Sequence, residues 1–123
     1  MQYLTDRKRA VGKGAGGSGT EHHWSLKISS IALAILIPAF LYIFGRALGQ
    51  DRATVLATFA HPFPAILTGL VLVIGMRHFA QGAQIMIEDY ARGGTRKALI
   101  IGVTLFSYAV IATGLFALAR IVL

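Results

Sequence analysis

Three long apolar segments, separated by short polar ones, dominate the hydrophobic pattern of this chain. They cover residues 28–48, 62–87 and 98–119, and the third contains no charged residue. A helix of roughly 20 residues crosses a hydrocarbon core of ~30 Å, and only a helix satisfies its own backbone hydrogen bonds within one lipid-exposed segment. The pattern therefore predicts an all-α membrane protein with three transmembrane helices.

The segments between the spans also predict structure. Asp51 is the expected N-cap of a short amphipathic helix that closes before Pro62 and lies along the outer interface. The loop over residues 88–95 is short and contains Gly93 and Gly94, so the second and third spans are expected to be antiparallel neighbours.

Composition supports the membrane assignment and excludes several functions. Only 14% of the residues are charged, against about a quarter in soluble domains. The chain has no cysteine, which excludes a disulfide and a thiolate-ligated metal centre of its own, and it lacks a Gly-rich nucleotide-binding motif. Any redox chemistry must therefore come from a bound cofactor or from a partner.

The distribution of basic residues predicts the orientation. The net charge is +7, but the charges lie between apolar blocks and form no stripe, so binding to nucleic acid is not expected. By the positive-inside rule, the N-terminus is cytoplasmic and the C-terminus periplasmic. Eight basic residues share the cytoplasmic side: Arg7, Lys8, Arg9, Lys13, Lys27, Arg92, Arg96 and Lys97.

The domain organisation follows from the same pattern. Residues 1–24 are basic and rich in Gly and Ser, and they are expected to form a flexible cytoplasmic tail. Residues 25–123 form the three-helix anchor. Within it, small residues recur every four positions, and we expect each row to pack the helices of this chain against one another. The rows are Ser30, Ala34 and Pro38 in the first span and Ala109, Thr113 and Ala117 in the third.

The second span carries an unusual polar stripe. Arg77 and His78 lie inside it, where an ionisable side chain costs several kcal/mol unless it faces protein or a cavity. Gly75 and Gly82 lie one turn before and after His78 on its own helix face. The space they leave fits either another helix or a flat macrocycle whose iron takes the imidazole, and the two interpretations stay open. A haem with two histidine ligands would require a second histidine from a partner helix.

Three further residues are candidates for a site. Arg77 could pair with a haem propionate or with a carboxylate or carbonyl group of a neighbouring chain. Asp89 lies on the same face as His78, about 16 Å along the axis, and Tyr90 follows it. A phenol beside a carboxylate could hydrogen-bond a quinone and relay protons, or it could be an ordinary interfacial pair.

These motifs resemble a known family. Ser18-Gly19-Thr20-Glu21-His22-His23-Trp24 before the first span, with His78, Gly82 and Ile87-Glu88-Asp89-Tyr90 around the second, is similar to the hydrophobic membrane anchor of succinate dehydrogenase, respiratory complex II, in its alphaproteobacterial form. The resemblance runs from about Ser18 to the end of the chain.

The resemblance implies a cofactor, a substrate, partners and a location. His78 would be an axial ligand of haem b, with the second histidine from the cytochrome b subunit, anchor C. Tyr90 and Asp89 would belong to the ubiquinone site. The flavoprotein and iron–sulfur subunits would be the other partners, and the complex would lie in the bacterial inner membrane.

The chain departs from the family pattern at three positions. In the segment around Lys27, the family usually has an Arg. Lys27 keeps the positive charge near the haem or quinone but lacks the planar guanidinium group of Arg. Arg77 replaces an uncharged residue, and Arg92 stands where relatives often have His. Two other functions compete with the electron-transfer subunit: a structural anchor or assembly protein without a cofactor, and a small proton-carrier subunit.

Overall fold

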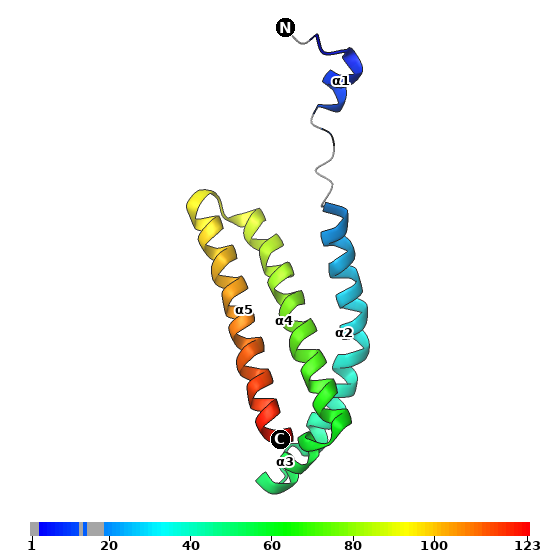
Figure 1. Cartoon of the computed structure of the whole chain (residues 1–123), viewed down its shortest axis with the longest axis vertical. Helices are drawn as coiled ribbons and strands as arrows, with labels where there is room; N and C mark the ends of the chain where they lie inside the picture. Colours follow the sequence, from blue (N-terminus) through cyan, green and yellow to red (C-terminus); the bar gives the residue numbers. More distant parts are fainter. Residues whose placement is uncertain (1–2, 13, 15–18) are drawn as a thin grey trace.

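The computed structural model describes residues 3–12, 14 and 19–123, and this part of the chain forms five helices and no strand (Figure 1). The helices are α1 (Asp6–Val11), α2 (Gly19–Ala47), α3 (Arg52–Ala60), α4 (Pro62–Tyr90) and α5 (Gly93–Val122). Helices α2, α4 and α5 are long and apolar enough to cross a membrane, which confirms the predicted all-α fold with three spans. The protein is a multi-pass membrane protein.

The three long helices extend beyond the apolar segments that predicted them. Each has 29 or 30 residues, or about 44 Å of helix, against a hydrocarbon core of ~30 Å. Helix α2 begins at Gly19, well before Ile28, because a helix continues through the interface after its side chains stop being apolar. The tail expected over residues 1–24 falls partly on residues outside the described set, and its flexibility stays a prediction.

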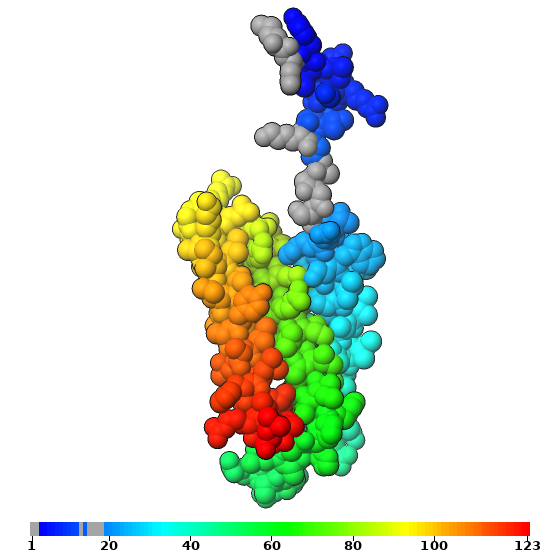
Figure 2. Space-filling view, in the orientation of Figure 1, coloured from blue at the N-terminus to red at the C-terminus, as the bar shows by residue number. Residues whose placement is uncertain are grey.

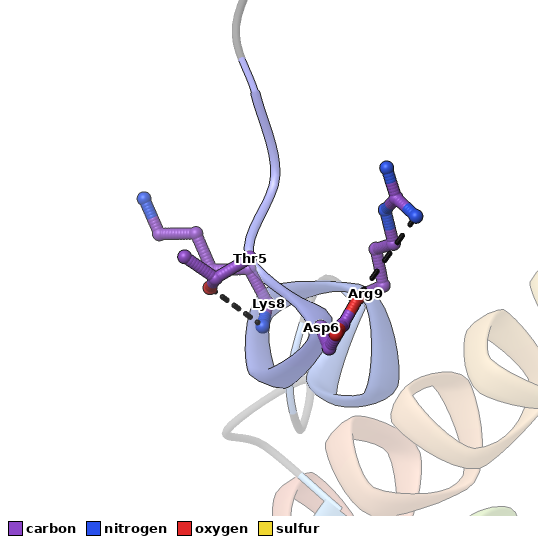
Figure 3. Close-up of polar contacts among 4 residues, drawn as sticks. All are labelled: Thr5, Asp6, Lys8 and Arg9. Carbon is purple, nitrogen blue, oxygen red and sulfur yellow. Dashed lines mark hydrogen bonds and ion pairs between the residues drawn. The ribbon is translucent and has the colours of Figure 1, made fainter.

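Helix α1 is a single short element in the basic N-terminal segment. The Thr5 hydroxyl accepts a hydrogen bond from the Lys8 backbone N–H at 3.3 Å and so caps the helix, and Arg9 lies 3.9 Å from Asp6 (Figure 3). Within the described residues, α1 makes no contact with another helix.

Helix α3 is the short helix predicted between the first two spans. Asp51 occupies its N-cap position with an extended backbone, as expected. The Thr54 side chain holds the pKa of the Asp51 carboxyl below its usual range, so a negative charge remains at the positive end of the helix. Helix α3 contacts α2, α4 and α5 at the end of the molecule far from the N-terminus (Figure 1).

Helix α4 is the centre of the fold. It packs against α5 on one side and α2 on the other, whereas α2 and α5 make no contact with each other in the described residues. The order α5, α4, α2 is visible across one face of the molecule, with the three helices side by side (Figure 2). The chain is therefore an open layer with two uncovered faces, and α4 and α5 are antiparallel neighbours as predicted.

Glycine allows the closest approach between α4 and α5. A Cβ atom built on Gly114 would overlap the side chain of Leu72, and one on Gly69 would touch Leu118 at 3.6 Å. The two rows of small residues predicted to make such contacts are instead exposed. That prediction is wrong, because these rows lie on the open faces of the layer and not on its internal contacts.

The orientation can be tested with single cysteines, because the chain has none of its own. Thr54 and Thr95 are exposed at opposite ends of the layer. We expect Thr54→Cys to react with a membrane-impermeant maleimide in spheroplasts, and Thr95→Cys to react only in inside-out vesicles. The opposite labelling would overturn the orientation derived from the basic residues.

The α4–α5 contact can be tested at Gly114. We expect Gly114→Val to lower the free energy of unfolding of the detergent-solubilised protein by about 1–3 kcal/mol, because Leu72 must move to admit the new side chain. Gly102→Val on the same helix is the matched control, since no atom lies within 4 Å of the position its Cβ would take. Equal losses in the two variants would contradict the close contact.

Candidate functional site

His78 is held between α4 and α2 by a hydrogen bond. Its Nδ1 atom lies 2.8 Å from the Oγ of Ser29, on the neighbouring helix, and both residues are half-buried. The Ser29 hydroxyl is also 2.9 Å from the backbone carbonyl of Leu26. The imidazole is thus fixed by a side chain from a different span.

These two contacts are compatible with a neutral imidazole that carries its proton on Nδ1. A serine hydroxyl has one proton to donate and two lone pairs. When Ser29 donates to the Leu26 carbonyl, its Oγ accepts from Nδ1–H of His78. The other ring nitrogen, Nε2, then carries the lone pair, which is the form in which histidine binds a metal.

His78 also lines an apolar groove on one face of the layer. The groove has a volume of about 460 Å³, within the range of small-molecule and cofactor sites. Its other walls come from one side of α2: Ser30, Leu33, Ala34, Ile37 and Pro38. The row of small residues in the first span therefore clears space beside the histidine and does not pack against this chain.

The two glycines around His78 have different surroundings. A Cβ on Gly75 would lie 3.9 Å from the Leu33 side chain, whereas a Cβ on Gly82 would meet nothing within 4 Å. On the Gly75 side of His78, the absence of a side chain is therefore explained by the close approach of helix α2. The other side is open, as a flat ligand requires.

Arg77 lines two grooves that differ from the groove beside His78. It lines a groove of about 510 Å³ between α2 and α4 and a smaller one of about 170 Å³ between α4 and α5, and His78 lines neither. Adjacent helix residues point about 100° apart, which explains the separation. In the larger groove, Gln81 donates to the Ser25 hydroxyl at 2.9 Å.

Lys27 makes a contact within its own helix. Its ammonium group is 5.4 Å from the centre of the Trp24 ring, one turn earlier on α2, and both side chains are exposed. The distance is that of a cation–π contact. In this chain, Lys27 interacts with Trp24.

Asp89 and Tyr90 end helix α4 and are both exposed, Tyr90 at 88%. Their neighbour Glu88 is engaged differently: it accepts from Gln84 at 3.0 Å and lies 3.5 Å from Arg96 of α5. Within the described residues, Asp89 and Tyr90 make no side-chain hydrogen bond or ion pair. The structure thus leaves the phenol and the carboxylate available to a ligand or to a partner.

The sequence did not identify Ser29 and Ser25 as partners of the polar stripe. Ser25 and Ser29 are four residues apart on α2, and their partners Gln81 and His78 are three apart on α4. Residues three or four apart lie on one helix face, so each helix presents two polar side chains on the same face. This spacing could have predicted the contact from the sequence. No cluster of three His, Asp or Glu side chains occurs in the part of the chain that the structure describes.

Comparison with known proteins gives a consistent match. The family model for "Succinate dehydrogenase/Fumarate reductase transmembrane subunit" matches residues 1–117. A Paracoccus denitrificans protein is 48% identical over 120 residues, 98% of this chain and 93% of its own length. A Rickettsia bellii protein is 31% identical over 101 residues, 80% of each chain. Both relatives are named succinate dehydrogenase hydrophobic membrane anchor subunit. No solved structure matches the chain.

Proposed function

Because this chain belongs to the succinate dehydrogenase/fumarate reductase transmembrane subunit family, we propose that it supplies His78 as an axial ligand of haem b within a succinate:quinone oxidoreductase. As a member of this family it is an inner-membrane anchor subunit, with no catalytic activity expected of the isolated chain. The flavoprotein, the iron–sulfur protein and a second anchor subunit, cytochrome b, are its proposed partners.

The haem proposal rests on one observation, the environment of His78. The imidazole is half-buried, its Nδ1 is hydrogen-bonded to Ser29, and it lines a groove of about 460 Å³ with apolar walls. These features fit a flat, apolar macrocycle, because no described residue hydrogen-bonds Nε2 and the neighbouring side chains are small or aliphatic. When bound, a b-type haem supplies a one-electron redox centre.

The second axial histidine is proposed to come from the cytochrome b subunit. In this chain, His22 and His23 lie near the start of α2, and His61 lies between α3 and α4 at the other end of the layer. None shares the helix turn of His78. No atom of the described residues lies within 4 Å of the position that a Cβ on Gly82 would take, so these residues do not cover α4 there.

We propose that Tyr90 and Asp89 form part of a ubiquinone site at the cytoplasmic end of α4. The Tyr90 phenol would donate a hydrogen bond to a quinone carbonyl oxygen, and Asp89 would hold water for proton delivery. Their exposure supports this role, since neither side chain is used within the described chain. Arg77 and Lys27 are proposed to add positive charge in the vicinity of the haem or quinone.

The haem assignment predicts the outcome of His78→Ala. We expect the four-subunit complex to insert but to lose nearly all of its b-type band in the reduced-minus-oxidised spectrum, because an axial ligand is removed. His61→Ala is the control at the opposite end of α4 and should retain the band. A wild-type complex without such a band, or a His78→Ala complex that keeps it, would reject the proposal and favour a cofactor-free anchor.

The quinone assignment predicts a selective defect in Tyr90→Phe. We expect succinate-dependent quinone reduction to fall roughly tenfold, as for the loss of one hydrogen bond of about 1.5 kcal/mol, while reduction of artificial acceptors at the soluble subunits is unchanged. Tyr42→Phe, at the other end of the layer, is the matched control. If both activities of Tyr90→Phe fell together, Tyr90 would have a structural role.

A further inference from the structure

We infer that Ser29 is the positioning residue for the haem ligand: its hydroxyl fixes the imidazole of His78 in the Nδ1–H tautomer and orients Nε2 for iron. This inference rests on the proposed haem site. It assigns a role to a residue of α2 that lies on a different span from the ligand itself.

The geometry of three atoms supports the assignment. Ser29 Oγ lies 2.9 Å from the Leu26 carbonyl of its own helix and 2.8 Å from Nδ1 of His78, both ordinary hydrogen-bond distances. The bond to Leu26 uses the hydroxyl proton and restricts its rotation. The lone pairs of Oγ then remain to accept from Nδ1–H, and this is the arrangement that we infer for the ring.

Burial makes this hydrogen bond specific. Ser29 and His78 are both half-buried at the contact between α2 and α4. No other hydrogen bond to the His78 ring occurs in the described residues. In hydrocarbon, water is absent as a substitute partner, so the Ser29 hydroxyl sets the ring orientation.

The chemical type of the partner also matters. A metal-bound histidine commonly donates its second N–H to a carboxylate, a carbonyl or water, and that acceptor adjusts how strongly the ring donates to the metal. A serine hydroxyl is an uncharged, weak acceptor. It leaves the ligand a neutral imidazole with moderate basicity, which is enough to orient the ring without adding negative charge to a membrane site.

The same helix pair provides a matched control one turn away. Ser25 Oγ accepts a hydrogen bond from Gln81 at 2.9 Å, again between α2 and α4. Removing either hydroxyl deletes one serine-mediated bond between the helices. Only the Ser29 bond involves the proposed ligand, so differences between the two variants report on His78 and not on helix association.

The experiment compares Ser29→Ala, Ser29→Thr and Ser25→Ala in the purified four-subunit complex. The measurements are haem per complex, the low-spin electron paramagnetic resonance signal and the haem midpoint potential. In Ser29→Ala we expect roughly ten- to a hundredfold weaker haem retention and a higher potential, because the ring becomes a poorer donor to ferric iron. Ser29→Thr keeps the hydroxyl and should restore both values, and Ser25→Ala should leave the potential and the signal unchanged.

Two results would overturn the role of Ser29. One is a Ser29→Ala complex with the retention, resonance signal and potential of the wild type. The other is an equal shift in Ser29→Ala and Ser25→Ala, which would assign both serines to helix packing. The proposed haem function is tested separately, by the b-type band of the wild-type complex and by its loss in His78→Ala.

Discussion

The cost of leaving a polar side chain unpaired in hydrocarbon is the constraint on which this structure depends. Helix α4 carries His78, Gln81 and Gln84 within a span, and each is hydrogen-bonded: to Ser29, to Ser25 and to Glu88. Two of these bonds join α4 to α2. Apolar side chains gain little from leaving lipid for one another, so such bonds, with close packing, determine how membrane helices associate. Two serines of α2 therefore contribute to the register of α2 on α4.

The open layer explains why this chain functions with partners. Helix α4 touches α2 and α5, but these two do not touch each other in the described residues. Both faces of α4 are thus accessible, one with His78 beside its apolar groove and the other with Arg77 beside polar side chains. Lipid can cover the apolar parts of these faces. An arginine in the middle of a span requires a polar partner, which further subunits of a complex can provide.

The sequence predicted the parts of the fold that depend on local pattern. The three spans, the short helix after Asp51 and the antiparallel pair α4–α5 follow from apolar length, capping and loop length. Contacts between helices were harder to predict from the sequence. The small-residue rows were expected inside the chain but lie on its exposed faces, because the spacing of small residues does not specify which helix they meet. The separation of Arg77 from His78 is a consequence of the 100° turn between adjacent residues, whereas the partnership of Ser29 with His78 depends on a register that only the folded chain defines.

This partnership links haem binding to helix association. A hydrogen bond between membrane helices contributes only about 0.6 kcal/mol on average, so the Ser29–His78 contact alone holds α2 and α4 together weakly. A ligand that binds only the paired helices stabilises them in proportion to the logarithm of its concentration relative to its dissociation constant. With His78 as the proposed ligand and Ser29 as its support, binding of haem and docking of α2 on α4 become one equilibrium. A weak bond can then have a large effect, because it determines which arrangement of the helices the cofactor stabilises.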